Sequence, residues 1–169
     1  MNLTKVLCLD LDGTVRRSKS GKTFIEGPDD IELMPGILPL LKKYHQEGWI
    51  LIGVSNQAGV AHGYKTYDTM GKEMEATYKL CWNNGPILFD ILATTGDPTG
   101  KVKPHLYRSL CRKPDYGMLA IAEYKFIRQG IYPDWDNSLF VGDRPEDEEC
   151  AKRAGIPFMH IDEFLKQPI

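Results

Sequence analysis

Two aspartates, Asp10 and Asp12, stand at the end of a short apolar segment near the N-terminus. Residues 6–11 are apolar except for Asp10, and Asp12 and Gly13 follow them. An apolar run without alternation is typical of a strand buried on both faces, and parallel sheets bind ligands at the carboxyl ends of such strands. Burying two carboxylates is costly unless they bind a metal or react. We therefore expect Asp10 and Asp12 to form a reactive centre.

The elements that would position these aspartates alternate between strands and helices. Apolar runs predict strands over residues 6–11, 49–54, 90–93, 139–141 and 157–161. Helical spacing and terminal signals predict helices over 35–48, 67–82, 116–129 and 146–154, with a last turn over 163–166. This alternation indicates an α/β fold with a Rossmann-like, doubly wound parallel sheet, and we expect residues 1–169 to form a single domain.

Two segments fall outside this alternation. Residues 16–30 are rich in charge and turn formers, which favours either a small flap over the end of the first strand or a solvated loop. Residues 94–113 are partly basic and predict a long loop, which in a compact domain is usually functional or mobile. Either segment could set substrate specificity.

Polar side chains follow the other predicted strands as well. They are Ser55 and Asn56, then Arg112 and Lys113 in the loop before the helix at 116–129, and Asp143 with Asp147. Because the carboxyl ends of parallel strands meet at one edge, we expect these residues to share a pocket. Carboxylates at close range require a counter-cation, and an oxygen-only set suits Mg²⁺. A lysine and an arginine facing that cation would suit a phosphate group.

Composition narrows the function further. The net charge is −2, so we expect no broad electrostatic capture of nucleic acid, although a local basic groove remains compatible with it. None of the four cysteines forms a C-x-x-C pair, which favours reduced thiols in a cytoplasmic protein. No apolar run reaches the roughly 20 residues of a membrane span, so we expect no membrane partner.

The ordered motifs resemble those of the haloacid dehalogenase-like phosphatase superfamily. Asp10-Leu-Asp-Gly-Thr14 is similar to its D-x-D-G-T signature, Ser55 in V-S-N-Q to its second motif, and Lys113 in C-R-K-P to its third. The fourth motif is similar to the segment Gly142-Asp-Arg-Pro-Glu-Asp147. The gaps between these motifs are short, which implies a member without a large cap domain. Such members have an open site and often take extended substrates.

This resemblance implies a role for each site residue. Asp10 would be the nucleophile that forms an aspartyl-phosphate, and Asp12 the general acid and base. Mg²⁺ would be held by Asp10, the backbone carbonyl of Asp12 and Asp143, with Asp147 supporting it or simply favouring the start of its helix. The residues that would hold phosphate or substrate are Ser55, Asn56, Arg112 and Lys113.

Two subfamilies that act on different substrates are both resembled by parts of this chain. The N-terminal third resembles polynucleotide 3′-phosphatase domains, through Ser20-Gly-Lys22 and Gly27-Pro28-Asp29. The C-terminal half resembles heptose bisphosphate and histidinol-phosphate phosphatases, through the segment 111–119. That second group commonly carries a zinc loop, for which this chain offers only Cys111 and His105, so we expect no structural zinc. We therefore expect a nucleic-acid 3′-phosphatase, with a small phosphate ester such as heptose bisphosphate as the alternative. A catalytically silent domain on this scaffold is a third alternative, although every catalytic position is retained.

Overall fold

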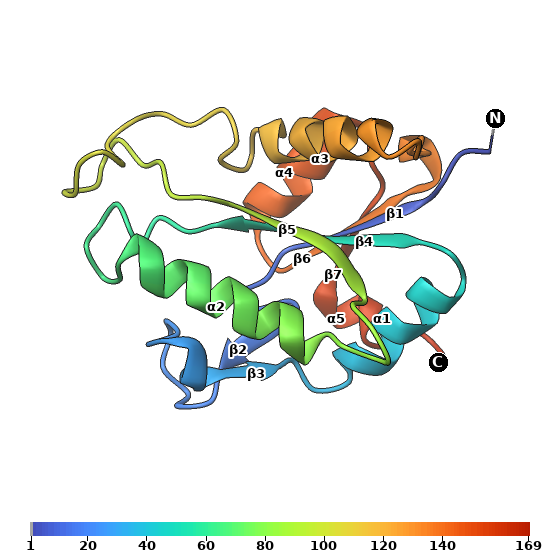
Figure 1. Cartoon of the computed structure of the whole chain (residues 1–169), viewed down its shortest axis with the longest axis horizontal. Helices are drawn as coiled ribbons and strands as arrows, with labels where there is room; N and C mark the ends of the chain where they lie inside the picture. Colours follow the sequence, from blue (N-terminus) through green and yellow to red (C-terminus); the bar gives the residue numbers. More distant parts are fainter. Residues whose placement is uncertain (1) are drawn as a thin grey trace.

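The computed structural model of the chain, which describes residues 2–169, is built around one parallel sheet (Figure 1). Its strands are β1 (Val6–Leu9), β4 (Ile50–Asn56), β5 (Leu88–Thr94), β6 (Leu139–Gly142) and β7 (Phe158–His160), in the spatial order β5-β4-β1-β6-β7. Every neighbouring pair in this sheet is parallel. The order reverses direction at β1, which places the end of that strand at a topological switch point.

Helices cover both faces of the sheet (Figure 1). One face packs against α3 (Gly117–Arg128) and α4 (Pro145–Ala154), and the other against α1 (Ile37–Gln46), α2 (Tyr67–Leu80) and α5 (Ile161–Phe164). β1 joins the two cores, because its alternating residues Leu7 and Cys8 belong to opposite clusters and both are fully buried. The prediction of an α/β, doubly wound fold is confirmed. Because the strands of the sheet run in the same direction, the loops that follow them meet at one edge.

The segment after β1 forms the predicted flap. β2 (Arg16–Ser18) and β3 (Ile31–Leu33) pair as an antiparallel two-stranded sheet, with the short 3₁₀ helix η1 (Pro28–Asp30) before β3. This small sheet packs against α2 (Figure 1). Its first residue, however, is not part of a solvated stretch, because Arg16 is completely buried.

The predicted element boundaries differ from the observed ones at several ends. β4 continues through Ser55 and Asn56, and β5 begins at Leu88 rather than at residue 90. The final turn is a short helix that begins at Ile161, and a 3₁₀ helix, η2 (Trp135–Asn137), precedes β6. The long loop runs from β5 to α3, over residues 95–116.

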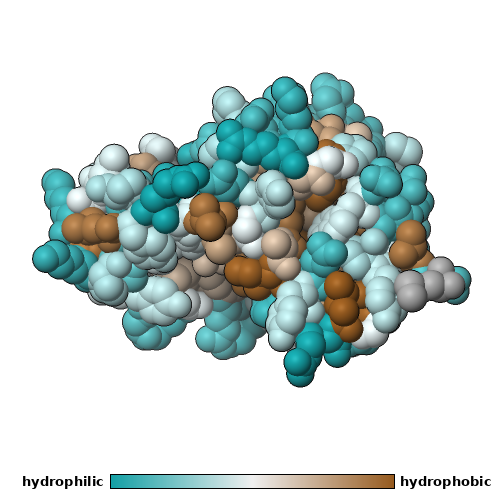
Figure 2. Space-filling model, turned by 90° about the horizontal axis from the view of Figure 1, so that it is seen from above, coloured by the Kyte–Doolittle hydropathy of each residue, from teal (hydrophilic) through white to brown (hydrophobic). Residues whose placement is uncertain are grey.

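The outer surface over α3 is mostly hydrophilic, with separate hydrophobic patches rather than one continuous apolar face (Figure 2). Ile121, Tyr124 and Ile127 of α3 are among its exposed apolar side chains. Within residues 2–169, no helix is long and apolar enough to span a membrane.

Candidate active site

Asp10, which directly follows β1, lies at the centre of a buried charge cluster. Its Oδ1 lies 2.6 Å from Lys113 Nζ, and the same ammonium lies 2.6 Å from Asp147 Oδ1. The Lys113 ammonium also donates to the Val54 carbonyl at 3.0 Å, so all three of its protons have acceptors. Lys113 comes from the long loop and Asp147 from α4, so three distant segments converge on the end of β1.

Asn56 fixes the backbone of the loop residue that reaches Asp10. Its Nδ2 donates to the Lys113 carbonyl at 3.0 Å, and its Oδ1 accepts from the Lys113 amide at 2.9 Å. Both polar ends of the Asn56 side chain are therefore engaged by one backbone unit. The structure thus gives Asn56 a direct role in placing Lys113, whereas the predicted phosphate contact of its side chain stays a prediction.

Asp143 and Asp147 sit at the turn from β6 into α4. Asp147 Oδ2 accepts from the backbone amides of Asp143 and Arg144, at 3.2 and 3.1 Å, which caps the helix N-terminus. With its other oxygen on Lys113, both carboxylate oxygens of Asp147 are engaged, as expected of a supporting residue. Asp143 differs, because its Oδ1 is buried and has no hydrogen-bond partner among residues 2–169.

Gly13 lets the turn after β1 approach Asp143 closely. A Cβ added at Gly13 would lie 2.4 Å from Asp143 Oδ2, and the backbone there has φ of +90°, which disfavours side chains. The glycine of D-x-D-G-T therefore serves both the turn and the space that Asp143 needs.

Asp12 is held by groups that differ from those around Asp10. Arg16 Nε donates to Asp12 Oδ1 at 2.7 Å, and Gln57 Nε2 donates to Asp12 Oδ2 at 2.8 Å. Gln57 also donates to Ser55 Oγ at 2.8 Å, so the strand end of β4 is linked to Asp12. Burial raises the pKa of Asp12, but the Arg16 charge and its hydrogen bonds outweigh that effect, and the net pKa is lowered.

The pKa of Asp10 is shifted in the opposite direction from that of Asp12. Burial raises the pKa of Asp10 to about 7, the Asp147 and Asp143 carboxylates act in the same sense, and Lys113 opposes them. For Lys113, burial lowers the pKa, but the two carboxylates outweigh burial, so its pKa is raised and it remains an ammonium. The charged form of Asp10 therefore needs more positive charge than Lys113 alone supplies.

The donor set around Asp10 fits a hard divalent cation. Carboxylate oxygens of Asp10, Asp143 and Asp147 lie within 4.8 Å of one another. Asp143 Oδ1 has no partner in the described chain, and Asp10 Oδ2 has only a long contact of 3.4 Å with the Thr14 hydroxyl. Oxygen-only ligands with open sides are what Mg²⁺ prefers, because it retains several waters. The predicted Mg²⁺ ligands Asp10 and Asp143 are thus brought together.

Arg112 lies further out, in the long loop. One of its terminal nitrogens lies 3.3 Å from Asp97 Oδ2, while its NH1 is buried and has no partner among residues 2–169. His62 also reaches Asp97, at 3.3 Å. His105 Nδ1 contacts the Thr95 hydroxyl at 2.8 Å. Arg112 therefore lines the cavity, with one buried nitrogen that has no partner among the described residues.

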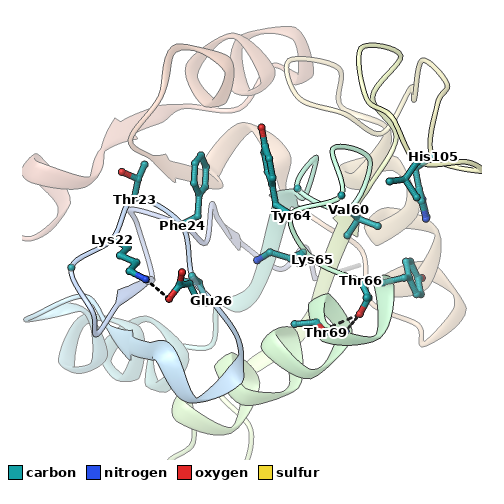
Figure 3. Close-up of a pocket in the computed structure, with 16 residues that line it drawn as sticks. Lys22, Thr23, Phe24, Glu26, Val60, Tyr64, Lys65, Thr66, Thr69 and His105 are labelled. Atoms are coloured by element: carbon teal, nitrogen blue, oxygen red, sulfur yellow. Dashed lines mark hydrogen bonds and ion pairs between the residues drawn. The ribbon is translucent and has the colours of Figure 1, made fainter.

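The site opens into a cavity of about 820 Å³ whose walls include Asp10, Asp12, Ser55 and Lys113. A second cavity of about 1330 Å³ adjoins it, between the flap and the loop after β4. There the rings of Phe24 and Tyr64 stand side by side, as Figure 3 shows, with centroids 6.1 Å apart. Both rings are mostly exposed, so the groove beside the acidic centre has an aromatic rim.

Several residues of this site escaped the sequence prediction. The sequence pattern predicts a flap or a solvated loop around Arg16 and no role for Gln57, although Gln57 directly follows Ser55 and Asn56. The position of Gln57 at a strand end was a usable signal. Arg16 offered only its spacing from Asp12, because its other partners lie in α2, far along the sequence.

Residues 5–164 match the family model described as polynucleotide kinase 3 phosphatase. The chain belongs to this family. Two curated relatives are 7-phosphatases of D-glycero-manno-heptose-1,7-bisphosphate. The Photorhabdus laumondii protein is 31% identical over 92% of this chain and 81% of its own length. The Thermoplasma volcanium protein, named as a probable enzyme of this kind, is 29% identical over 91% of this chain and 96% of its own length.

Among solved structures, D,D-heptose 1,7-bisphosphate phosphatase from B. bronchiseptica, complexed with magnesium and phosphate, superposes with a TM-score of 0.68. It is 26% identical, and the match covers 92% of this chain and 79% of that one. The resemblance to haloacid dehalogenase-like phosphatases is thereby confirmed, and this family member is a phosphatase.

The comparisons alter the expected substrate. The named curated relatives act on a small sugar bisphosphate, and the nucleic-acid substrate that we expected finds no specific support in them. The family description carries the word polynucleotide. The alternative reading from sequence, a phosphatase of the heptose bisphosphate type, is therefore better supported than the first one.

Proposed function

We propose that this chain is a Mg²⁺-dependent phosphomonoester hydrolase that acts on a phosphorylated sugar of the heptose bisphosphate type through an aspartyl-phosphate at Asp10. The observation that carries this proposal is the Asp10 carboxylate itself. It is paired with the buried Lys113 ammonium, lies beside the unpartnered Asp143 Oδ1, and faces a cavity. A carboxylate is a weak nucleophile, so a surround that neutralises a phosphoryl group is what it requires.

In the first half-reaction, a carboxylate oxygen of Asp10 attacks phosphorus. A bond forms between that oxygen and phosphorus as the ester P–O bond breaks, and Asp12 gives its proton to the leaving oxygen. Asp10 Oδ2 is the less engaged oxygen, since Oδ1 accepts the hydrogen bond from Lys113. This half-reaction leaves a free alcohol and a phosphorylated Asp10.

In the second half-reaction, a water molecule attacks the same phosphorus. Asp12, now a carboxylate, accepts the water proton, the P–O bond to Asp10 breaks, and inorganic phosphate leaves. Asp12 thereby regains the proton that it gave up in the first half-reaction, and Arg16, which lowers the pKa of Asp12, stabilises the carboxylate that exists in between. Asp10 returns to its starting form.

Mg²⁺, when bound, neutralises negative charge on the phosphoryl group; Asp10, Asp143 and the Asp12 backbone carbonyl would hold it. Lys113 would bind a phosphate oxygen in place of one of its present acceptors, beside the Ser55 hydroxyl, and Arg112, which lines the same cavity, would face the rest of the substrate. Asn56 contributes by fixing the Lys113 backbone. Asp147 supports the same lysine.

The sugar bisphosphate substrate is supported by the names of relatives that match nearly the whole chain. Removal of a 3′-phosphate from a nucleic acid end is the second candidate. It is favoured by the family description and by the exposed rings of Phe24 and Tyr64, since bases stack on such rings.

A substrate panel tests the proposal. Phosphate release with Mg²⁺ is compared between D-glycero-D-manno-heptose 1,7-bisphosphate, a 3′-phosphorylated oligonucleotide and 4-nitrophenyl phosphate. We expect the highest kcat/KM for the heptose bisphosphate and loss of all three activities in Asp10→Asn. A preference for the oligonucleotide would overturn the substrate assignment, and full activity in Asp10→Asn would overturn the mechanism.

A further inference from the structure

Arg16 is a fully buried cation beside the reactive centre. Its side chain is completely buried, although it begins a strand of the surface flap. Burying a guanidinium costs several kcal/mol unless its donors are used. Here they are used on two sides, toward Asp12 and toward α2.

Toward the site, Arg16 and Gln57 together hold both oxygens of Asp12. Arg16 Nε donates to Oδ1 at 2.7 Å and Arg16 NH2 approaches Oδ2 at 3.4 Å, while Gln57 donates to Oδ2 at 2.8 Å. The Asp12 side chain is still 39% exposed, so it faces the cavity while its orientation is fixed.

The backbone reinforces this pairing. The Arg16 amide donates to the Leu11 carbonyl at 3.0 Å, and the Gly13 amide donates to the Arg16 carbonyl at 2.9 Å. Residues 11–16 therefore form a closed turn in which Asp12 and Arg16 cannot separate without breaking these bonds. A guanidinium with two parallel donors also holds a carboxylate more firmly than a single ammonium would.

Toward α2, the same guanidinium is anchored in the protein interior. Arg16 NH1 donates to the Thr77 hydroxyl at 2.7 Å and to the Glu73 carbonyl at 3.1 Å. Thr77 and Glu73 are themselves fully buried. Through Arg16, the orientation of Asp12 is thus fixed relative to α2, a helix that supplies none of the predicted reactive residues.

We infer that Arg16 is the positioning residue for Asp12, holding its carboxylate in the direction from which it serves the leaving oxygen and the attacking water. This inference rests on the proposed function, because it presumes that Asp12 transfers protons. Arg16 itself is buried and touches no substrate, so it acts only through Asp12.

A positioning role for Arg16 makes the effect of its replacement depend on the leaving group. The alcohol of an alkyl phosphate must leave as an alkoxide unless Asp12 protonates the ester oxygen, whereas 4-nitrophenolate leaves without a proton. The value of kcat/KM reports the steps through formation of phosphorylated Asp10. Misplacing Asp12 should therefore lower kcat/KM for an alkyl phosphate and spare kcat/KM for the aryl phosphate.

The experiment compares Arg16→Met, Arg16→Lys and Asp12→Asn with the wild type on the best alkyl phosphate of the panel and on 4-nitrophenyl phosphate. In Arg16→Met we expect kcat/KM for the alkyl ester to fall about tenfold or more, a part of the 10²–10⁴-fold that general acid catalysis contributes, with a change under about threefold for the aryl ester. Arg16→Lys, which keeps the charge but not the fork, should give an intermediate loss.

Arg17→Met is the matched control, because Arg17 is the next residue and pairs with Glu32 on the flap surface rather than with Asp12. We expect Arg17→Met to leave kcat/KM unchanged for both substrates. Introducing Arg16→Met into Asp12→Asn should also leave the alkyl-to-aryl ratio unchanged, since no acid remains to be positioned.

The possible outcomes distinguish a failure of the role proposed for Asp12 from a failure of the positioning role of Arg16. If Asp12→Asn lowers the alkyl and aryl values equally, the assignment of Asp12 in the proposed function fails. If Asp12→Asn discriminates but both Arg16 variants lower the two values in parallel, or leave both unchanged, the positioning role is overturned. Thermal unfolding checks that each variant is folded. If Arg16→Met is not folded, the same comparison is made with Arg16→Lys.

Discussion

Replacing Asn56 by alanine separates two roles that a residue at this strand end could have. If its side chain chiefly held phosphate, Asn56→Ala would weaken substrate binding and leave the fold intact. The structure shows instead that the side chain bonds both backbone polar groups of Lys113, at 3.0 and 2.9 Å. We therefore expect the fold and the turnover rate to suffer more than KM.

The size of the stability loss follows from what the alanine leaves behind. Each of the two hydrogen bonds contributes about 1 kcal/mol net, and a buried donor or acceptor left without a partner costs about 1–3 kcal/mol. Lys113 is only 4% exposed, so water does not readily replace Asn56 at its amide and carbonyl. The expected loss is about 2–4 kcal/mol, a large share of a typical total of about 5–15 kcal/mol.

Urea unfolding at neutral pH measures this loss, and the chain offers a matched control. Asn137 also makes two side-chain bonds, to the Asp134 carboxylate at 3.0 and 3.1 Å, but on the exposed surface. We expect Asn137→Ala to cost less than about 1 kcal/mol, since exposed groups regain water. In steady-state assays Asn56→Ala should lower kcat, because Lys113 loses its placement against Asp10.

A role for Asn56 in holding Lys113 would be refuted if Asn56→Ala unfolded at the same urea concentration as the wild type while KM rose and kcat stayed constant. That pattern would mean that Asn56 contacts the substrate and does not hold Lys113. An equal loss in Asn56→Ala and Asn137→Ala would also contradict the importance given to burial.

Three further perturbations test other parts of the account. Lys113→Met leaves two buried carboxylates without their cation, so urea unfolding in Mg²⁺-free buffer should show a loss of about 3–5 kcal/mol; a loss under about 1 kcal/mol would contradict the charge cluster. Gly13→Ala places a Cβ 2.4 Å from Asp143 Oδ2, so the Mg²⁺ concentration for half-maximal activity should rise about tenfold or more, and an unchanged value would argue against Asp143 as a ligand. Hydrogen bonds from Thr99 lower the pKa of Asp97 from 3.8 to about 2, so the Asp97 carboxylate stabilises the fold fully above about pH 4 and ceases to do so as the pH falls toward 2. The difference in free energy of unfolding between wild type and Asp97→Asn should therefore narrow from about pH 4 to about pH 2. A constant difference over that range would contradict the role given to the Thr99 hydrogen bonds.

Much of the fold was predictable because its signals are local. The apolar runs of β1 and β4 and the polar residues that end them identified the edge of the sheet where ligands bind. The convergence of Asp10 and Asp143 also followed from parallel topology, since strands that run together end together, whereas Lys113 was identified only by its resemblance to the third motif. The flap was one of two readings of its composition, and the pairing of β2 with β3 decides between them.

What escaped prediction depends on contacts between distant residues. Arg16 stands in a run of charged and polar residues, and only its bonds to Asp12, Thr77 and the Glu73 carbonyl make its burial tolerable. The use of Asn56 as a clamp likewise requires knowing that Lys113 returns to the end of β4. Local composition carries neither piece of information, because both follow from how the loop and α2 pack.

The substrate was the least predictable feature. Motifs one to four define the chemistry at phosphorus, which is common to every phosphate ester. The leaving group would lie beyond these residues, over the cavities beside Phe24 and Tyr64, and aromatic and charged residues there do not by themselves identify a substrate. Similarity over nearly the whole chain to heptose bisphosphate phosphatases supplies the stronger guide.

The central claim is that phosphate passes through a covalent intermediate on Asp10. Wild type and Asp12→Asn, each in excess over 4-nitrophenyl phosphate with Mg²⁺, are quenched in acid within one turnover and digested for peptide mass analysis. We predict one added phosphoryl group on the peptide containing Asp10, present for longer in Asp12→Asn because water is no longer activated. Phosphate release at normal rates with no phosphorylated Asp10 at any time point, in either protein, would contradict the account.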